Sequence, residues 1–404
     1  KVKTKGQNEG EKLLKPKLRF KEFNDNWTLI SLNSLMEFKN GINATKDAYG
    51  KGIKYISVTD ILNNNFITYE KIKGLVNIDN ITLKNNSVTY GDVVFQRSSE
   101  TIEDIGRANV YLDHNKVATF GGFVIRGKKK GNYNPLFINY LLQNSSSRKA
   151  IIVKGAGAQH YNISQEELEK IELYFPSIQE QEKIANLLSL LDKKIELQKR
   201  KIDALKIYKR GLIQKLYDQK YKNKIKMKNI IKQKSIRNTN NEIKDIYSVN
   251  NKEGFVLQTD QFKDRIVASE DTTNYKIVKK DYFAYNPARI NVGSIARMKY
   301  EKIGIISPMY ICFECKNNVL PEYLEYFFET DIFTYEMKKR LEGSVRMCLS
   351  YESMLNIPID LPDIIQQERI SKVLNEFDKR INCEKIKYDH QKRLKDALLQ
   401  KMFI

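Results

Sequence analysis

The sequence predicts a mixed α/β (or α+β) fold, in which two lobes of short strands and helices are each followed by a long helix. Three observations carry this prediction. One long stretch of sequence occurs twice, the repeated stretch has the apolar spacing of a long paired helix, and each copy follows a segment of short β-rich runs. The chain is therefore expected to be an internal repeat with pseudo-twofold character.

Length and composition limit the possible classes of protein. The 404 residues suffice for two or three domains, and 41% of them are hydrophobic, enough for folded cores. Seventy basic residues against 49 acidic ones give a formal charge of +21, which favours a nucleic acid as partner. No run of eighteen apolar residues predicts a membrane span or a secretory signal. Four cysteines are too few for a disulfide framework, so a cytoplasmic location is expected.

The repeat is read directly from the sequence. When Leu173 is aligned with Ile359, the stretch Leu173–Tyr217 falls without a gap on Ile359–Phe403, and 17 of the 45 positions are identical. The identical pairs include Pro176/Pro362, Gln181/Gln367, Glu182/Glu368, Ile184/Ile370, Leu188/Leu374, Asp192/Asp378, Ile195/Ile381, Lys206/Lys392, Leu212/Leu398 and Gln214/Gln400. So many identities indicate a duplication.

Each repeated stretch is expected to be one long helix that begins just after a proline. Apolar residues recur at alternating spacings of three and four, as in a heptad seam, and polar Gln198 and Lys209 interrupt this pattern. Both copies share one register and one polar gap, which favours mutual pairing as a coiled coil. The alternative is that each helix packs only on its own lobe.

These patterns predict the domain boundaries. Residues 1–14, rich in Gly, Lys and Glu, are expected to form a disordered segment, followed by the first lobe at 15–176, the first long helix at 177–221, the second lobe at 222–362 and the second long helix at 363–404. The stretch 219–237 holds eight Lys or Arg and no acid. It is interpreted as a basic linker, either solvated or in contact with phosphates.

Motifs for catalysis are lacking. Asn286-Pro287-Ala288-Arg289 has only the first two letters of an amino-methyltransferase motif, and no phosphate-binding Gly-x4-Gly-Lys sequence occurs. Cys312 and Cys315 have the spacing of a zinc knuckle, but no second pair follows and a strand would put the two thiols on opposite faces. The sequence therefore predicts no catalytic, cofactor-binding or metal-binding residue in this chain.

The sequence offers several candidate DNA-binding residues. Those of the first lobe lie directly after an apolar strand and in a glycine-bearing loop, and those of the second lobe hold comparable places. Their side chains offer bidentate donors and acceptors for base edges and hydroxyls for phosphates. For Arg97 the alternative is an internal salt bridge. The candidates are Gln96, Arg97, Ser98, Gln159, His160, Tyr161, Asn162, Arg289, Asn291, Ser344 and Arg346.

The order of lobe, helix, lobe, helix resembles the specificity subunit of type I restriction–modification systems over nearly the whole chain. The likeness rests on Pro16–Phe20 with Phe23 and Trp27, on Gly91-Asp92 and its following strand, and on the passage from Gly155 through Gln179–Ile184. The second half departs from the family pattern at Lys280-Asp281, in place of Gly-Asp, and at Arg346.

The resemblance implies a function. Each lobe would be a target-recognition domain that reads one half of a bipartite, asymmetric site on double-stranded DNA through the major groove. The two helices would pair antiparallel, set the spacer length and dock two adenine-methyltransferase subunits, to which restriction (translocase–nuclease) subunits add. S-adenosylmethionine, ATP and Mg would then belong to those partners and not to this chain.

Two other functions are consistent with the residues alone. One is a coiled-coil scaffold with two protein-binding lobes, which would leave the +21 charge unexplained. The other is the recognition half of a single-chain restriction–methylation enzyme, which would need a catalytic region upstream. A methyltransferase encoded in an adjacent reading frame would favour a separate specificity subunit over the single-chain enzyme.

Overall fold

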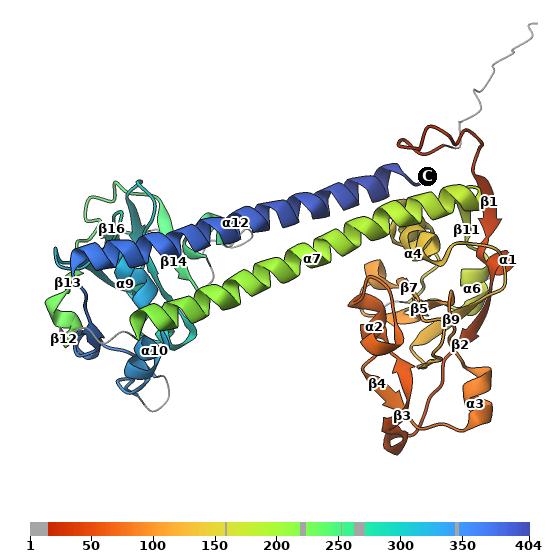
Figure 1. The fold of residues 1–404 in the computed structure, drawn as a ribbon, viewed down its shortest axis with the longest axis horizontal. Coiled ribbons are helices and arrows are strands. Elements are labelled where there is room, and N and C mark those ends of the chain that lie inside the picture. The colour runs from red at the N-terminus through yellow and green to blue at the C-terminus, as the bar shows by residue number, and fades with distance from the viewer. Residues whose placement is uncertain (1–14, 158–159, 219–223, 252, 262–270, 344–346) are drawn as a thin grey trace, which may run out of the picture. The chain divides into compact units, whose positions relative to one another are not determined.

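Two compact units make up the computed structural model of the chain, which describes residues 15–157, 160–218, 224–251, 253–261, 271–343 and 347–404. Unit 1 consists of the described residues up to Lys199 together with Ile386–Ile404, and unit 2 is Arg200–Lys385 (Figure 1). Each unit thus contains part of both long helices, α7 (Ile178–Tyr217) and α12 (Ile364–Lys401). None of the described helices is long and apolar enough to cross a membrane.

Unit 1 is built on two sheets. A four-stranded antiparallel sheet has the order β2-β9-β5-β7, and a three-stranded sheet has the order β4-β3-β8 with β3 and β8 parallel. Its strands and α-helices before α7 are β1 (Thr28–Ser31), α1 (Leu32–Leu35), β2 (Met36–Asn40), β3 (Tyr49–Ile56), α2 (Val58–Leu62), β4 (Gly74–Val76), α3 (Asn80–Asn85), β5 (Val93–Gln96), β6 (Ser98–Ser99), β7 (Ala108–Val110), β8 (Thr119–Phe120), β9 (Val124–Lys129), α4 (Pro135–Gln143), α5 (Ser145–Ile152), β10 (Tyr161–Asn162), α6 (Gln165–Glu169) and β11 (Glu172–Phe175).

The central strand β5 is buried on both faces, which explains its continuous apolar sequence. Val93 and Phe95 point into a core shared with α4 and the start of α7, whereas Val94 points to the three-stranded sheet. Helix α4 begins where Asn134 caps it, since the Asn134 side chain accepts hydrogen bonds from two backbone N–H groups, and Pro135 takes the first helical position.

Unit 2 repeats this architecture. Its four-stranded sheet has the order β13-β20-β17-β18, and its second sheet, β15-β14-β19-β16, again contains one parallel pair, β14 with β19. Its strands and α-helices between α7 and α12 are β12 (Lys224–Lys226), β13 (Ile231–Lys234), β14 (Ile246–Asn250), β15 (Gly254–Leu257), α8 (Gln258–Gln261), β16 (Lys276–Val278), β17 (Phe283–Tyr285), β18 (Ile295–Arg297), β19 (Gly304–Ile306), β20 (Ile311–Cys315), α9 (Pro321–Phe327), α10 (Asp331–Lys338), α11 (Tyr351–Leu355) and β21 (Pro358–Asp360).

The long helices run antiparallel within the units. In unit 2, Lys201 of α7 forms an ion pair with Glu384 of α12, and Lys209 forms one with Asp378. Residue numbers therefore rise along α7 as they fall along α12, so the two helices are antiparallel. In unit 1, the start of α7 shares a hydrophobic cluster with Met402 and Phe403, at the far end of α12. The predicted fold class, a mixed α/β repeat with two long helices in antiparallel pairing, is confirmed.

The end of each long helix completes the core of the other lobe. Phe403 packs against Phe137 of α4 with ring centroids 5.5 Å apart, and Tyr217 packs against Tyr323 of α9 at 4.7 Å. These two pairs occupy equivalent places, because the offset of the repeat carries Tyr217 onto Phe403 and Phe137 onto Tyr323. The core of unit 1 therefore needs residues from both ends of the described chain.

The basic stretch 219–237 requires a correction. Residues 219–223 lie outside the described part, but residues 224–234 form two strands joined by a short 3-10 helix (Met227–Asn229) and are not a linker. Strand β12 pairs with β21, and β13 forms the edge of the four-stranded sheet against β20. Charge alone predicts a linker here. Over residues 224–228, Lys alternates with the apolar residues Ile225 and Met227, which is compatible with a strand that has one solvated face.

Candidate nucleic-acid interface

The end of β5 positions the first predicted group. Gln96 is buried, and its amide Nε2 donates a hydrogen bond of 2.9 Å to the carbonyl of Ser98. Arg97 follows, half-buried, and its guanidinium donates to the carbonyl of Gly122 at 3.3 Å. Among the described residues no carboxylate forms an ion pair with Arg97. The internal salt bridge considered for Arg97 is therefore absent from the described part of the chain, which leaves its charge available to a ligand.

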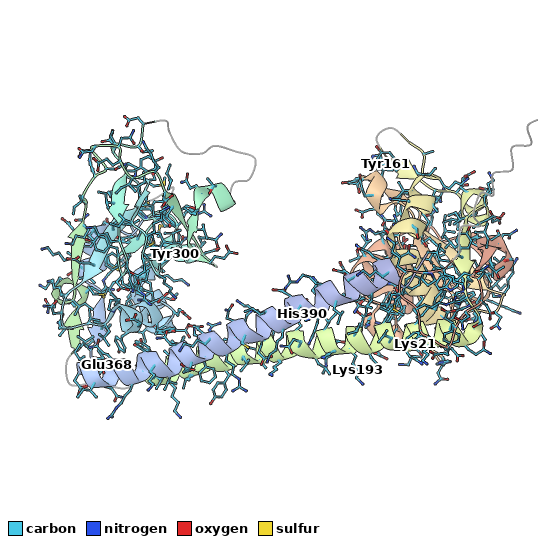
Figure 2. All side chains as sticks on the ribbon, turned by 90° about the horizontal axis from the view of Figure 1, so that it is seen from above. Lys21, Tyr161, Lys193, Tyr300, Glu368 and His390 are labelled. Atoms are coloured by element: carbon cyan, nitrogen blue, oxygen red, sulfur yellow. The ribbon has the colours of Figure 1, made fainter. Side chains whose placement is uncertain are left out.

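The structure brings two of the predicted loops together. Strands β6 and β10 pair antiparallel, with Ser98 opposite Asn162 and Ser99 opposite Tyr161. The hydroxyl of Ser98 donates to the side-chain oxygen of Asn162 at 2.5 Å. Figure 2 shows Tyr161 at the end of unit 1 that lies away from α7.

The other residues of this loop differ in their surroundings. His160 is exposed, whereas Tyr161 is half-buried and packs against the hydrophobic core. Gln159 lies outside the described residues. His160 and Asn162 are thus the solvent-facing members of the loop, and Tyr161 has a packing role.

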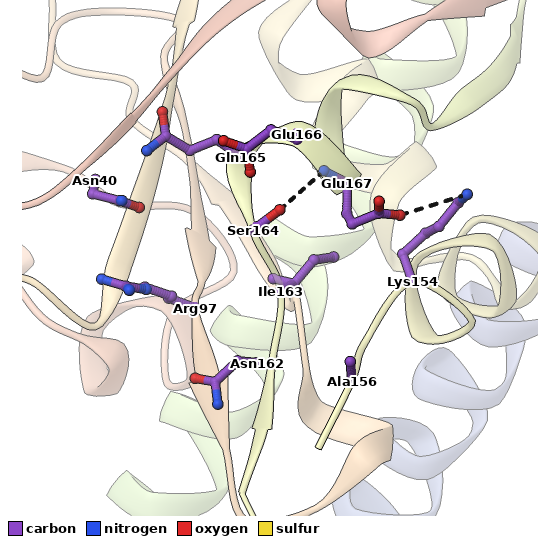
Figure 3. A pocket seen from close by; sticks show the side chains of 10 residues that line it. All are labelled: Asn40, Arg97, Lys154, Ala156, Asn162, Ile163, Ser164, Gln165, Glu166 and Glu167. Carbon is purple, nitrogen blue, oxygen red and sulfur yellow. Dashed lines mark hydrogen bonds and ion pairs between the residues drawn. The ribbon is translucent and has the colours of Figure 1, made fainter.

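A cleft of about 370 Å³ opens beside this pair of strands (Figure 3). Arg97 and Asn162 lie on its wall. Its full lining is Asn40, Arg97, Lys154, Ala156, Asn162, Ile163, Ser164, Gln165, Glu166 and Glu167. Ser164 caps α6 by accepting from the backbone N–H of Glu167, and the Glu167 carboxylate pairs with Lys170 and Lys154, which together hold its pKa below the usual value. The amide and guanidinium groups of the cleft form a set of donors and acceptors suited to base edges.

Unit 2 places its candidates at the equivalent strand end. The sheet registers align Asn286, just after β17, with Gln96, and its side-chain oxygen accepts from the backbone N–H of Ala288 at 3.0 Å. Arg289 begins a short 3-10 helix (Ile290–Val292), and both Arg289 and Asn291 are exposed. Ser344 and Arg346 lie outside the described residues.

The loops are tied to the strand ends in the same way in both units. In unit 1, Ala156 pairs with Asn162, and the N–H of Ile163 donates to the carbonyl of Arg97. In unit 2, Glu342 pairs with Cys348, and the N–H of Leu349 donates to the carbonyl of Pro287. The two lobes therefore share one backbone arrangement but carry different side chains at the equivalent strand end.

One protein family matches both halves of the chain. The family described as "Type I restriction modification DNA specificity domain" matches residues 24–206 and again 223–390. The chain belongs to this family. Each match covers one lobe and most of the long helix that comes after it, so the chain carries two specificity domains in tandem.

The individual proteins that resemble this chain share a quarter of its residues or fewer in the aligned regions. A putative type I restriction enzyme MjaX specificity subunit from Methanocaldococcus jannaschii is 25% identical over 202 residues, 48% of this chain and 46% of that protein. The chain thus matches about half the length of this relative. The crystal structure of a type I S subunit from M. genitalium is 18% identical and superposes with a TM-score of 0.58, covering 96% of this chain and 99% of that one.

A second solved structure agrees with this fold. A chain from a study of complex assembly and conformational transition of the type I R-M system is 10% identical, with a TM-score of 0.58, and covers 92% of this chain and 96% of that one. At these identities the likeness is one of fold.

The Gly-Asp signature of the first specificity domain has a structural explanation. Gly91 adopts a left-handed conformation with φ of +87°, and the buried carboxylate of Asp92 accepts from the backbone N–H groups of Thr89 and Lys129. Burial raises the pKa of Asp92, and these hydrogen bonds partly offset the rise. In the second specificity domain, the sheet register places Asp281, and not Lys280 as the sequence alignment predicts, at the position of Gly91, and Asp281 also has a positive φ, +65°.

Several residues that line the cleft were not among the residues predicted from the sequence. Asn40 lies at the end of β2, and Lys154 and Gln165 flank the predicted loop. Lys154 could have been found from its place beside the glycine loop, but nothing in the sequence indicates that Asn40 comes close to Arg97. Their proximity follows from the order β2-β9-β5 of the sheet.

The two spaced cysteines do not face each other. Cys312 belongs to the core between the two sheets of unit 2, and Cys315 packs against the core shared with the helices. Burial raises the pKa of both thiols to about 12. Within the part of the chain that the structure describes, no group of three or more His, Cys, Asp or Glu residues could hold a metal ion.

Proposed function

We propose that the chain is the non-catalytic DNA-specificity subunit of a type I restriction–modification complex, each specificity domain reading one half of a bipartite, asymmetric DNA site. The observation that carries the proposal is the placement of unlike polar groups at equivalent strand ends. Asn286 aligns with Gln96, and the exposed Arg289 lies two residues beyond the position that aligns with Arg97. The same scaffold with different side chains would read different bases.

The charge of the chain supports DNA as the ligand. A net charge of +21 favours contacts to phosphates, and Arg97 and Arg289 have no ion-pair partner among the described residues. Arginine can bind guanine through two hydrogen bonds in the major groove. The side-chain amides of Asn40, Asn162 and Gln165 would supply the matching groups for adenine or for water-mediated contacts.

The partners follow from the same proposal. The long helices would dock two adenine-methyltransferase subunits and set the distance between the half-sites, and restriction subunits would join that complex. S-adenosylmethionine would bind to the methyltransferase subunits, and ATP and Mg would bind to the restriction subunits. This chain would supply recognition and contribute no group to the chemical step.

The test is reconstitution with an adenine methyltransferase subunit added as a separate protein. The isolated chain should transfer no methyl group, and the mixture should methylate adenines at one split sequence, mapped on genomic DNA. Exchanging residues 15–176 for the corresponding domain of another specificity subunit should change one half of that sequence only. A change in both halves, or methylation by the isolated chain, would contradict the proposal.

Salt dependence provides an independent check. If several Lys and Arg side chains contact phosphates, the logarithm of the DNA association constant should fall with the logarithm of salt concentration at a slope steeper than about −3. A shallower slope would argue against an electrostatic DNA interface and in favour of a protein-binding scaffold.

A further inference from the structure

A tight turn recurs beside the strand ends of both units. In unit 1 the turn follows β8, and the N–H of Val124 donates to the carbonyl of Gly121 at 2.8 Å. In unit 2 the turn follows β19, and the N–H of Tyr310 donates to the carbonyl of Ser307 at 3.1 Å. The turns are equivalent in position, although their sequences, Gly-Gly-Phe-Val and Ser-Pro-Met-Tyr, share no residue.

Each turn holds a large apolar side chain out into solvent. Phe123 is 68% exposed and Met309 is 60% exposed. A single exposed apolar residue is ordinary on a protein surface. Here two such residues occupy the same position in two domains that otherwise match poorly in sequence, which indicates that the position is apolar for a reason other than packing.

The turn in unit 1 is fixed tightly against the domain. A Cβ atom on Gly121 would lie 2.0 Å from the hydroxyl of Tyr55, and one on Gly122 would lie 1.8 Å from Oδ1 of Asn43. A side chain at either place would require Tyr55 or Asn43 to move. Phe123 therefore projects from a backbone that is held in place before any ligand arrives.

Both apolar residues adjoin the strand-end polar groups. The carbonyl of Phe123 accepts from the backbone N–H of Arg97 at 2.9 Å, and the carbonyl of Gly122 accepts from the Arg97 guanidinium. In unit 2, the amide of Asn286 lies 3.8 Å from the sulfur of Met309 and donates to it. Each turn thus places an apolar group next to a polar side chain at the strand end.

We propose that Phe123 and Met309 are specificity-determining residues, each making an apolar contact with the 5-methyl group of a thymine in the half-site read by its domain. The 5-methyl group is the apolar feature of the major-groove edges of the bases. The contacted thymine would be adjacent to the base that Arg97 reads in the first half-site and to the base read beside Asn286 in the second. This inference rests on the proposed DNA-reading function.

The experiment uses the full complex with its methyltransferase subunits and duplexes carrying the mapped site. Each thymine of the site is replaced in turn by uracil, which lacks the 5-methyl group, and affinity is measured for the wild type and for Phe123→Ala and Met309→Ala. For the wild type, one uracil in each half-site should weaken binding roughly three- to five-fold, the effect of one buried methyl group. Phe123→Ala should abolish the effect of one of these uracils and leave the other intact, and Met309→Ala should do the converse.

Matched controls use the exposed apolar residues six positions earlier, on the other side of β8 and β19. Val117→Ala and Ile303→Ala, 41% and 43% exposed in the wild type, should retain both uracil effects. Phe123→Leu should retain most of the contact. Mapping of methylated adenines should show that Phe123→Ala relaxes the preference for thymine at one position of one half-site.

The outcomes separate the inference from the function on which it rests. If the wild-type complex methylates one split sequence but Phe123→Ala responds to every uracil as the wild type does, the thymine contact is wrong and the DNA-reading function stands. If the wild-type complex shows no sequence preference, the proposed function itself fails, before any variant is measured.

Discussion

The Nζ atom of Lys395 in α12 lies 2.6 Å from Oδ1 of Asp192 in α7, and the hydroxyl of Tyr140 donates to the other oxygen of the same carboxylate. The arrangement recurs at the equivalent positions of the repeat with the helices exchanged: Lys209 pairs with Asp378, which accepts from Tyr326. Each Lys–Asp–Tyr cluster joins both long helices to one lobe. The polar residue Lys209, which interrupts the apolar seam, is therefore part of one of these two clusters, which we call clasps.

The two clasps should differ in strength. In unit 1 the side chains of Lys395 and Asp192 are 14% and 5% exposed, whereas Asp378 in unit 2 is 42% exposed. Lys395→Met should lower the free energy of unfolding of unit 1 by about 3 kcal/mol, because it leaves a buried carboxylate without its cation. Lys209→Met should cost unit 2 about 1 kcal/mol.

The single tryptophan makes this measurement selective. Trp27 is buried in unit 1, with its ring against Phe403, so its fluorescence in a denaturant titration reports on that unit, and circular dichroism reports on both. Lys193→Met, at an exposed position of α7, is the control and should leave the transition unchanged. Equal shifts of the tryptophan transition for Lys395→Met and Lys193→Met would contradict the assigned role of the clasp.

Arg19 should be essential to the start of α7. Its guanidinium donates two hydrogen bonds, of 2.8 and 2.7 Å, to the carboxylate of Glu180, which is 1% exposed. Arg19→Met should destabilise unit 1 by about 3–5 kcal/mol, since it leaves a buried charge unpaired, and the double variant Arg19→Met/Glu180→Met should recover part of the loss. The exposed neighbour substitution Lys17→Met should have little effect on the tryptophan transition. A double variant less stable than Arg19→Met would disprove this account.

Thiol reactivity should follow burial. Burial raises the pKa of Cys312 to about 12, so at pH 8 only about 1 in 10⁴ of its thiols would be thiolate even if reagent could enter. Iodoacetamide should therefore modify the exposed Cys383 and spare Cys312 and Cys315 until the chain is unfolded, as peptide mapping would show. Raising the pH to 9 should increase the reaction of Cys312 about ten-fold from this low value. Rapid labelling of Cys312 at pH 8 would be incompatible with the described core.

An insertion tests the long helices as the spacer between half-sites. Four residues added between Lys199 and Lys201, where the boundary between the units falls, extend a helix by about 6 Å. We expect the complex to keep both half-sequences and to lengthen the unread gap by one or two base pairs, read from the methylated sites. Some loss of stability is expected because the insertion rotates the seam. Activity with an unchanged gap would rule out the spacer role.

The long helices could be predicted from the sequence because residues that are identical in the two copies make the same contacts in both. Gln181 and Gln367, identical in the repeat, each accept a hydrogen bond from the backbone N–H of the residue just before the short helix of their lobe, and each donates to the carbonyl of the proline that precedes the long helix. Each contact uses both the oxygen and the nitrogen of the glutamine amide, which gives the identity of these two positions a structural reason. Apolar periodicity then gives the helix length.

The candidate site was only partly predictable. Residues directly after a strand, such as Arg97, could be placed from the local sequence, because an apolar run ends there. The contributions of Asn40 and Phe123 depend on which strands become neighbours in the sheet, and this is decided by contacts distant in sequence. For the same reason charge alone wrongly predicts a linker at residues 224–234, since it does not reveal that β13 pairs with β20.

The discontinuity of unit 1 has a consequence for synthesis on the ribosome. Unit 2 is one continuous segment, so all of its parts are present once Lys385 has been made, but unit 1 waits for Ile386–Ile404 while the whole of Arg200–Lys385 is translated. At roughly 5–20 residues per second this delay is roughly 10–40 s. During that time the surface of Trp27 and Phe137 that Phe403 later covers is open in the nascent chain. The first lobe to be synthesised is thus the last to complete its core.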